Sequence, residues 1–381
     1  MISDKLNILR QEQYPPDAKK GLRQFSLAEV AYFLGVTQST IKKLHLEGKG
    51  PEPQTSSSGR RSYSANQMLE LRAYLDEHGR PGKRRYLPQR REREELHVIS
   101  VVNFKGGSGK TTTASHLAQH LALKGHRVLA IDLDPQASLT ALHGIQPELD
   151  SVLSLYETLR YDVSRQSITS GIQPTNFPNL DIVPASLDLQ EYEYDTPLAL
   201  TRSDATEGRT FFTRISRALE DVESQYDVVV IDCPPQLGYL TLTALTASSS
   251  VLVTVHPQML DVMSMSQFLL MLGGILRTIR EAGAEIKLKW FRYLVTRFEP
   301  TDGPQKQMVG FLQAMFPDQM LETQMVKSTA ISDAGITKQT LYEVERSQFV
   351  RSTYDRAITS LNAVNDEIGR LIHQSWGREL P

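Results

Sequence analysis

The strongest constraint on the fold of this 381-residue chain is a glycine-rich segment, Phe104-Lys105-Gly106-Gly107-Ser108-Gly109-Lys110-Thr111-Thr112. It matches the phosphate-binding pattern G-x-x-x-x-G-K-[ST], except that Phe104 stands where the first glycine would be. In that pattern, backbone N–H groups surround the phosphates, the Lys reaches the β- and γ-phosphates and the hydroxyl binds Mg²⁺. The flanking sequence predicts a buried strand over 97–102 and a helix over 112–123. The segment therefore predicts a nucleotide-binding site between a strand and a helix.

Charged residues are divided unevenly between the two ends of the chain. Residues 1–97 contain 18 Lys and Arg against 12 Asp and Glu, whereas the remainder contains 24 against 32. An excess of positive charge at one end points to a segment that faces nucleic acid. Cys233 is the only cysteine, which excludes a disulfide framework and a cysteine-based metal site. With no apolar run of about 18 residues and no signal-peptide pattern, we expect a cytoplasmic protein without membrane contact.

From position 97 onward, apolar periodicity predicts strands that alternate with helices. Strands are expected over 97–103, 127–133, 180–184, 226–232, 250–256 and 288–296. Helices are expected over 110–124, 208–222, 238–248, 259–281, 304–315 and 350–374. This alternation predicts an α/β fold in which a mostly parallel sheet is flanked by helices on both faces. Ligands of such sheets bind at the carboxyl ends of the strands, where the glycine-rich segment lies.

The chain is predicted to have four parts. These are a short helix within 1–20 with a possible role in dimerisation, a small all-α DNA-binding domain over 21–78, a basic linker over 79–96 and a nucleotide-binding domain over 97–381. The linker is rich in Pro, Gly and cations up to residue 91, so we expect it to be extended and mobile. It either contacts phosphates or only tethers the two domains.

A helix-turn-helix is predicted within the small domain. Ser26 and Glu29 have the spacing of a capping box, and Gly35 permits a sharp turn before a second helix. The second helix would present Gln38, Ser39, Lys42 and Lys43 to a major groove. A basic wing over 59–63, which contains Arg60 and Arg61, and a helix over 64–78 complete an order that resembles winged helix-turn-helix domains of the MerR type. The alternative is a helical domain that serves only packing or dimerisation.

Two further strands end in carboxylates. Asp132 and Asp134 alternate at the end of one strand, so both side chains are expected on the same side. Asp232 ends the second strand and is followed by Cys233-Pro234-Pro235. Asp232 would hold Mg²⁺ through its waters, while Asp134 would orient an attacking water or reach Mg²⁺ through a water. Taken alone, each Asp is equally well explained as a strand-end cap.

Together these motifs resemble the deviant Walker A, switch I and Walker B/switch II motifs of ParA-type partition ATPases. The residues that carry the resemblance are Lys105, Lys110-Thr111, Asp132-Leu133-Asp134-Pro135-Gln136 and Asp232-Cys233-Pro234-Pro235. It covers about 97–375, and the N-terminal domain is similar to that of the larger, plasmid-borne subtype, which includes the RepA proteins of repABC plasmids. The resemblance implies weak ATP hydrolysis with Mg²⁺, in which Lys105, Lys110 and Asp134 have catalytic roles.

The resemblance also implies which residues surround the nucleotide. Lys105 would be the signature lysine, which reaches the partner's nucleotide in a dimer that holds ATP between its subunits. The expected nucleotide contacts are Lys105, Gly106, Gly107, Ser108, Gly109, Lys110, Thr111, Thr112, Asp232 and Pro234, with Thr111, Asp134 and Asp232 at the metal. Arg297, with Thr296 and Phe298, is expected to line the adenine pocket.

Partners follow from the same resemblance. ATP-bound dimers would coat nucleoid DNA nonspecifically, and a ParB-like protein bound at a centromere would stimulate hydrolysis and so move a plasmid. The ADP-bound or nucleotide-free form would repress its own operon through the helix-turn-helix. Nonspecific DNA contact needs only well-placed cations. The candidates are Lys327, Lys338, Arg346, Arg351 and Arg356, although ordinary solvated charges are the simpler explanation for each of them.

Two other functions share the nucleotide motif. A Min-type positioning ATPase would need a cationic amphipathic helix near the C-terminus, whereas 354–376 carries several acidic residues and few lysines. A transcriptional repressor that only senses a nucleotide would need both domains, as a partition protein does. The sequence does not separate this repressor from a partition protein.

Overall fold

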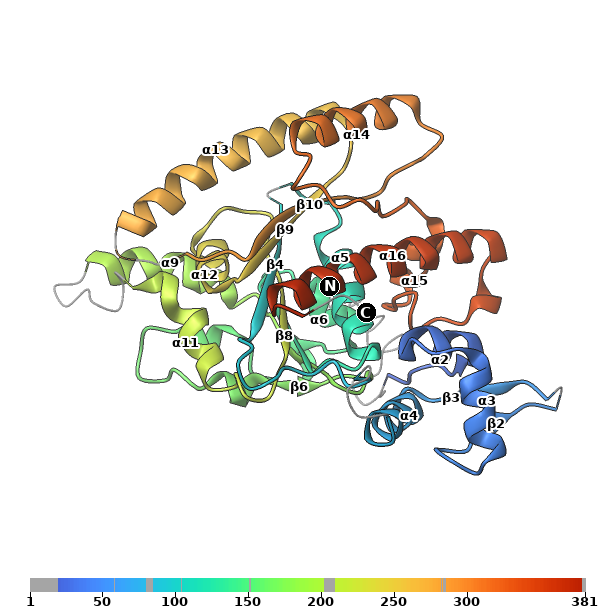
Figure 1. Cartoon of the computed structure of the whole chain (residues 1–381). Coiled ribbons are helices and arrows are strands. Elements are labelled where there is room, and N and C mark those ends of the chain that lie inside the picture. The colour runs from blue at the N-terminus through green and yellow to red at the C-terminus, as the bar shows by residue number, and fades with distance from the viewer. Residues whose placement is uncertain are drawn as a thin grey trace, which may run out of the picture.

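The computed structural model describes residues 20–57, 59–79, 85–103, 105–150, 152–201, 210–281, 283 and 286–378. These residues form a small N-terminal unit and a larger α/β unit that is built on a seven-stranded sheet (Figure 1). The helix expected within 1–20 lies outside the described residues up to position 19, as does the part of the expected linker at 80–84.

The large sheet confirms the expected parallel architecture. Its order is β10-β9-β4-β8-β5-β7-β6, and each neighbouring pair is parallel except β6 with β7. The sequence did not predict β6, which has two residues, one of them a proline. The strands are β4 (His97–Val102), β5 (Val128–Asp132), β6 (Gln173–Pro174), β7 (Leu180–Val183), β8 (Val228–Asp232), β9 (Ser250–Val255) and β10 (Trp290–Val295).

The long expected helices are present, with bounds close to those expected. The range 208–222 differs, because its described part begins with a 3-10 turn, Phe211–Thr213, before α11. Helix α9 was not expected, and Pro197 in its interior explains why, since proline disfavours a helix. The described helices are α2 (Leu27–Leu34), α3 (Gln38–Leu46), α4 (Ala65–Glu77), α5 (Lys110–Leu123), α6 (Ser138–Leu142), α7 (Pro147–Asp150), α8 (Tyr156–Leu159), α9 (Leu189–Thr201), α11 (Arg214–Glu220), α12 (Tyr239–Ala247), α13 (Met259–Glu281), α14 (Gly303–Met315), α15 (Thr329–Ile336) and α16 (Arg351–Ser375).

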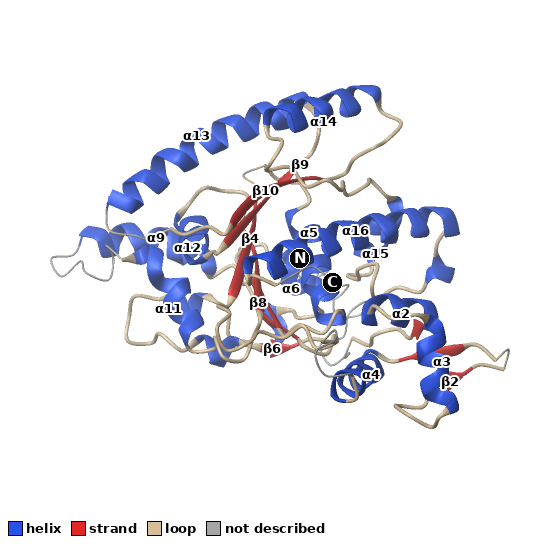
Figure 2. Ribbon diagram, in the orientation of Figure 1, coloured by secondary structure: helices blue, strands red, loops and turns tan. Residues whose placement is uncertain are grey.

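The sheet is covered on both faces, as Figure 2 shows. Side chains of β4 alternate between two apolar clusters, as the period of a strand requires. Ile99 and Val101 join the cluster that contains the apolar residues of α5 and α16. Val98 and Val102 join the cluster that contains those of α12 and α13. A strand that is apolar on both faces in this way is typical of a parallel sheet between two helical layers.

Helix α5 is buried on all sides. Every one of its residues is buried except Thr111 and Thr112, including the polar side chains of His116, Gln119 and His120. It packs on the sheet and against α16, and its first residue is the lysine of the glycine-rich loop. A helix that is buried all round belongs to the interior of a large fold.

The N-terminal unit has the element order that the sequence predicts. Ser26 and Glu29 form the capping box of α2, and Gly35 ends that helix in the left-handed conformation, with φ +65°. The expected all-α composition is wrong in one respect. A three-stranded antiparallel sheet, β1 (Phe25–Ser26), β3 (Arg61–Tyr63) and β2 (Gln54–Thr55), lies between the helices. Short strands of two or three residues leave little periodicity to detect.

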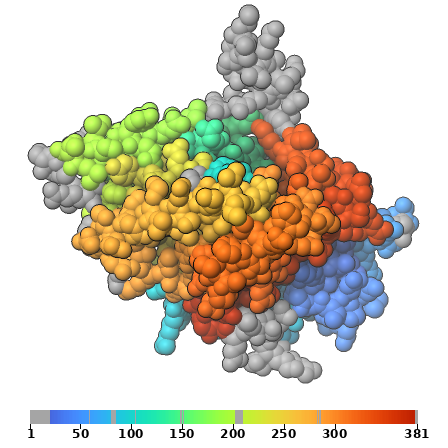
Figure 3. Space-filling model, turned by 90° about the horizontal axis from the view of Figure 1, so that it is seen from above, coloured from blue at the N-terminus to red at the C-terminus, as the bar shows by residue number. Residues whose placement is uncertain are grey.

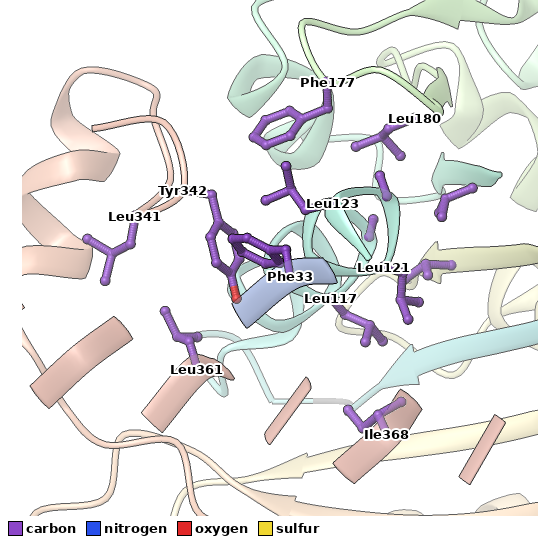
Figure 4. Close-up of a cluster of buried hydrophobic side chains, with 14 of the residues drawn as sticks. Phe33, Leu117, Leu121, Leu123, Phe177, Leu180, Leu341, Tyr342, Leu361 and Ile368 are labelled. Carbon is purple, nitrogen blue, oxygen red and sulfur yellow. The ribbon is translucent and has the colours of Figure 1, made fainter. Parts of the chain in front are cut away.

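The N-terminal unit packs directly on α5. Phe33 of α2 is 4% exposed and lies beside Tyr342 and the side chains of α5 (Figure 4). Its ring centroid is 5.7 Å from that of His120 and 6.2 Å from that of Tyr342. The buried side chains of α2, α5 and α16 belong to a single apolar cluster. The two units therefore share one core.

Polar contacts hold the same junction. Tyr32 donates its hydroxyl proton to Asp366 over 2.6 Å, and Lys124 pairs with the same carboxylate at 3.0 Å. Burial raises the pKa of Asp366, but hydrogen bonds from His120 and Tyr32 and the charge of Lys124 outweigh it and hold that pKa well below its usual value. Arg72 of α4 donates to the Phe33 carbonyl at 2.6 Å.

Hydrogen bonds that the sequence did not predict connect the described part of the expected linker to the α/β unit. Arg90 donates to the Tyr226 carbonyl at 3.0 Å and to the Glu94 carbonyl at 2.9 Å. Arg378, which follows α16, donates to the carbonyls of Pro88 and Gln89 at 2.8 and 2.7 Å. Arginine side chains thus tie 88–90 to the α/β unit, a tertiary effect that composition does not reveal.

One helix among the described residues, α13, is long and apolar enough to cross a membrane by those two criteria alone. In the structure it lies along the outside of the molecule, beside α14 (Figure 1). Asp261 and Arg277 interrupt its apolar sequence, and about a fifth of its most apolar window is buried. A single such helix is weak evidence for a membrane segment.

The shared core makes a testable prediction about Phe33. Phe33→Ala should lower the free energy of unfolding by about 3 kcal/mol, because truncation of a buried Phe leaves a cavity. It should also open the junction, so protease should cleave within 79–91 faster than in the wild type. Leu46→Ala, at a side chain that is 83% exposed on α3, is the control and should change neither value. Unaltered cleavage and melting of Phe33→Ala would contradict the shared core.

Candidate functional site

The glycine-rich loop connects β4 to α5 at the carboxyl edge of the sheet. Gly107 and Gly109 have φ values of +75° and +87°, a region that favours glycine. Thr296 donates its hydroxyl proton to the Ser108 carbonyl at 2.7 Å, and Thr254 donates to the Ser108 hydroxyl at 3.0 Å. Residues from β9 and from the end of β10 therefore fix the loop. Thr296 was named from the sequence only as a residue of the adenine pocket, and the sequence carried no signal for Thr254.

Lys110 lies under the loop as the first residue of α5. Its side chain is buried, with 7% of the residue exposed, and Nζ donates to the Lys105 carbonyl at 3.4 Å. Burial lowers the pKa of Lys110, while the nearby carboxylates of Asp232 and Asp134 act in the opposite direction. A bound phosphate would supply the negative charge that favours the ammonium form here.

Asp132 and Asp232 form a buried carboxylate pair. They are direct register partners at the ends of the neighbouring strands β5 and β8, and neither is exposed to solvent. Burial raises the pKa of Asp132 to about 7, against hydrogen bonds from the Thr140 amide and hydroxyl at 2.8 and 2.7 Å. Burial, and then the charge of Asp132, raise the pKa of Asp232 well above its usual value. The ionised form of one carboxylate thus disfavours ionisation of the other, and a bound cation would favour ionisation of both.

Asp232 is the member of the pair that lacks hydrogen-bond partners. Among the described residues, neither of its oxygens accepts a hydrogen bond of normal geometry. The Thr111 hydroxyl is nevertheless close enough to lower its pKa. An unsatisfied buried carboxylate beside a hydroxyl and a phosphate loop fits a hydrated Mg²⁺, which takes a few oxygen ligands and keeps several waters. No group of three or more His, Cys, Asp or Glu in the described residues suggests an all-protein metal site.

Asp134 lies beyond the end of its strand. Because β5 ends at Asp132, the alternation expected for Asp132 and Asp134 does not extend to Asp134. Instead the Asp134 amide donates to Asp132 at 3.2 Å, and the Asp134 carboxylate accepts from the Gln136 amide at 3.0 Å. This turn leaves Asp134 half-buried at the mouth of the site, while Pro234 is buried next to Asp232 and Thr112 is half-buried on α5.

Arg297 lies against the glycine-rich loop. Its guanidinium donates to the Gly107 carbonyl at 2.9 Å, and its own backbone is left-handed, with φ +52°. A left-handed backbone is uncommon for residues other than Gly, Asn or Asp. Where it occurs, it is often at a functional site. The contact places Arg297 beside the phosphate loop.

Lys105 is oriented differently from Lys110. Its side chain is 43% exposed, and Nζ pairs with Asp261 in the first turn of α13. Asp261 also lies 3.2 Å from Nδ1 of His256. Neither Asp261 nor His256 could be predicted from the sequence, because both lie far from Lys105 in the chain and match no motif.

The other expected contact residues lie on the surface. Gln38, Ser39, Lys42 and Lys43 are exposed on α3, and Arg60 is exposed in the hairpin. Arg61 is half-buried, with its guanidinium 3.3 Å from His45. Arg351 and Arg356 are exposed on α16, where Arg356 donates to the Lys327 carbonyl at 3.2 Å. Both the α3 set and the α16 set are thus accessible to a partner.

The sequence of this chain is similar to those of several known proteins. Residues 96–284 match the family model described as an AAA domain. A Sinorhizobium fredii (strain NGR234) protein that bears the name replication protein A is 72% identical over 100% of this chain and 93% of its own length. The chromosome partitioning protein ParA of Myxococcus xanthus is 33% identical over 62% of this chain and 77% of its own length.

A solved structure extends the likeness to bound ligands. Cobyrinic acid a,c-diamide synthase from Mycobacterium smegmatis, with a bound ATP analogue and magnesium, is 26% identical and has a TM-score of 0.55. The match covers 75% of this chain and 98% of that one. With the parallel sheet, the two-lysine loop and the strand-end carboxylates, these matches show that the chain belongs to the ParA-type family of P-loop partition ATPases.

Proposed function

We propose that this chain is an ATP-hydrolysing partition protein that dimerises around ATP, binds DNA in that state and moves DNA together with a ParB-like partner. The observation that carries the proposal is the different surroundings of its two loop lysines. Lys110 is buried beside the strand-end carboxylates, whereas Lys105 is partly exposed at the edge of the loop. These surroundings support a role for Lys110 at the nucleotide of its own subunit and a role for Lys105 at the nucleotide of a second subunit.

In this proposal the loop binds the phosphates of ATP. The backbone N–H groups from Gly106 to Thr112 surround them, and Lys110 reaches the β- and γ-phosphates. Thr111 and Asp232 hold Mg²⁺, which neutralises charge on the phosphates when bound. Asp134 orients the attacking water, while Pro234 and Arg297 flank the nucleotide. Burial around Lys110 and Asp232 strengthens each charge interaction, because the local dielectric is low.

The role proposed for Lys105 explains why hydrolysis would require a dimer. A cation supplied by the second subunit stabilises charge on the γ-phosphate, as an arginine finger does in other phosphate-transferring enzymes. Since the contact needs the γ-phosphate, the dimer dissociates after hydrolysis, which makes the nucleotide a switch.

Two DNA surfaces are proposed. Gln38, Ser39, Lys42 and Lys43 on α3, with Arg60 and Arg61 in the hairpin, would bind a specific operator and repress the operon. Arg351 and Arg356 on α16 would contribute to nonspecific DNA binding, which cations alone can supply. The exposure of both sets on separate elements supports this division. The N-terminal unit is accordingly proposed to be a winged helix-turn-helix domain over 21–78, tethered by 79–96 to an ATPase domain over 97–381.

A second candidate function is a repressor that senses a nucleotide without a role in segregation. The packing of the N-terminal unit on α5, the helix that begins at the loop, favours communication between the nucleotide and the operator. Binding to operator DNA and to random DNA, measured with ADP and with a nonhydrolysable ATP analogue, separates the candidates. A partition protein should prefer operator with ADP and random DNA with the analogue. A change in operator affinity without random-DNA binding supports the repressor alone.

Replacing each of the two lysines by Ala should affect a different property, either ATP affinity or dimerisation. Lys110→Ala should weaken ATP binding about 10- to 100-fold, because it removes a charged hydrogen bond to phosphate. Lys105→Ala should retain ATP affinity but lose the ATP-dependent dimer and hydrolysis. Calorimetry, sedimentation and phosphate release measure these quantities. Undiminished ATP affinity in Lys110→Ala, or a normal dimer in Lys105→Ala, would refute the corresponding role.

The raised pKa of the buried Asp232 predicts that its carboxylate lowers stability at high pH but is needed for hydrolysis. Because its pKa is raised in the folded protein, Asp232 contributes stability at low pH that is lost as pH rises through the folded pKa. Asp232→Asn should therefore raise the melting temperature of the nucleotide-free protein by roughly 2 °C at pH 8, with a smaller gain at pH 5.5. Mg²⁺-dependent hydrolysis should be lost. The control, Asp318→Asn at an exposed site, should change neither property, and a lower melting temperature of Asp232→Asn at pH 8 would contradict the proposal.

The division of DNA surfaces is tested on α3. Replacing both Lys42 and Lys43 by Ala should weaken operator binding with ADP by at least tenfold, since each removes a contact worth about 1 kcal/mol or more. Binding to random DNA with the ATP analogue should stay within about twofold of the wild type. Fluorescence anisotropy at one fixed salt concentration measures both. Equal losses on the two DNAs would mean that a single surface serves both.

A further inference from the structure

One carboxylate, Asp261, holds the exposed lysine of the glycine-rich loop in the single subunit. Lys105 Nζ pairs with Oδ1 of Asp261, while Nδ1 of His256 lies 3.2 Å from Oδ2 of the same group. Asp261 is 8% exposed, whereas the Lys105 side chain is 43% exposed. The carboxylate is therefore fixed by its surroundings, and the lysine is the partner that is free to leave.

The charge of Asp261 is balanced at neutral pH by Lys105. Burial lowers the pKa of His256, and the neighbouring Asp261 does not fully offset this, so the imidazole is neutral at pH 7. It then donates a hydrogen bond through Nδ1–H but carries no charge. When Lys105 leaves, His256 still contacts one oxygen of the Asp261 carboxylate. Opening the ion pair therefore leaves only the other oxygen without its partner.

The pair lies on the face where the proposed dimer forms. Asp261 is in the first turn of α13, directly beyond the end of β9, next to the loop that carries Lys105. Figure 3, which views this face from above, shows α13 and α14 at the front of the molecule. A lysine that is held on this face must change partners before it can contact a nucleotide in another subunit.

We propose that Asp261 is a positioning residue that holds Lys105 in the unpaired subunit and so sets the concentration at which the ATP-bound dimer forms. This inference rests on the proposed function, in which Lys105 contacts the nucleotide of the second subunit. The Asp261 carboxylate and those phosphates compete for the same ammonium group. Only subunits whose Lys105 has left Asp261 are competent to pair, and the apparent affinity falls by that fraction.

The Lys105–Asp261 ion pair affects the dimer dissociation constant twice, once for each subunit. A symmetric dimer uses one Lys105 from each subunit, so two ion pairs must open for each dimer that forms. A partly exposed ion pair changes an equilibrium by only a few-fold. With about threefold for each subunit, removal of Asp261 should tighten the dimer by about tenfold.

The experiment measures dimerisation of the full chain by sedimentation velocity with Mg²⁺ and a nonhydrolysable ATP analogue. Asp261→Asn should lower the dimer dissociation constant about tenfold, while the affinity of the single subunit for the analogue stays unchanged. Asp261→Glu, which keeps the charge, should remain within about twofold of the wild type. Glu281→Gln removes the same charge from the exposed far end of α13 and should have no effect.

An unchanged or weaker dimer in Asp261→Asn would overturn the inference, and a weaker one would mean that Asp261 aims Lys105 at the partner. Asp261→Ser serves as a second neutral variant in case the Asn protein does not fold, and it should also tighten the dimer. Lys105→Ala distinguishes failure of the proposed function from failure of this inference. If Lys105→Ala dimerises normally, the proposed function fails, whereas a Lys105→Ala protein that stays monomeric beside an unchanged Asp261→Asn dimer defeats this inference alone.

Discussion

The structure depends on the burial of α5. This helix starts at the phosphate loop and lies between the sheet and α16. At its far end His120 and the following residue, Lys124, contact Phe33 and Tyr32 of the N-terminal unit. Its burial is nearly complete, so it cannot shift without repacking the core around Phe33 and Tyr342. The helix that begins at the glycine-rich loop is therefore also the platform for the proposed DNA-reading unit, which would give the proposed nucleotide-dependent operator binding a physical basis.

In the single subunit without nucleotide, the buried carboxylates at the carboxyl edge of the sheet have too little positive charge nearby to favour their ionised forms. Asp132 and Asp232 meet without solvent, and burial raises the pKa of both. The neighbouring Lys110 is itself buried, and burial lowers its pKa. A nucleotide with Mg²⁺ would relieve both, because the metal would allow Asp232 to ionise and the phosphates would favour the ammonium of Lys110. Nucleotide binding would therefore stabilise the folded protein, since the ligand binds the folded state and relieves these charges.

Most strands and long helices, and the glycine-rich loop, could be predicted from the sequence because local patterns of residues specify them. Continuous apolar runs located the buried strands, and the spacing of Ser26 and Glu29 located the start of α2. The pairing of Lys105 with Asp261 could not be predicted, since it depends on where α13 begins relative to β9 in space. The same holds for Phe33 against α5 and for the arginines that tie 88–90 to the α/β unit. Proline inside α9 shows the reverse case, in which tertiary packing overrides a local preference.

If the two loop lysines serve different subunits, Lys105 leaves Asp261 when a dimer forms. A crystal structure of the full chain with Mg²⁺ and a nonhydrolysable ATP analogue would show the partners of both lysines. We expect two subunits with the nucleotides between them, Lys110 of each subunit on its own nucleotide, and Lys105 within hydrogen-bonding distance of the partner's phosphates. A nucleotide-bound dimer in which Lys105 still pairs with Asp261 would contradict this expectation.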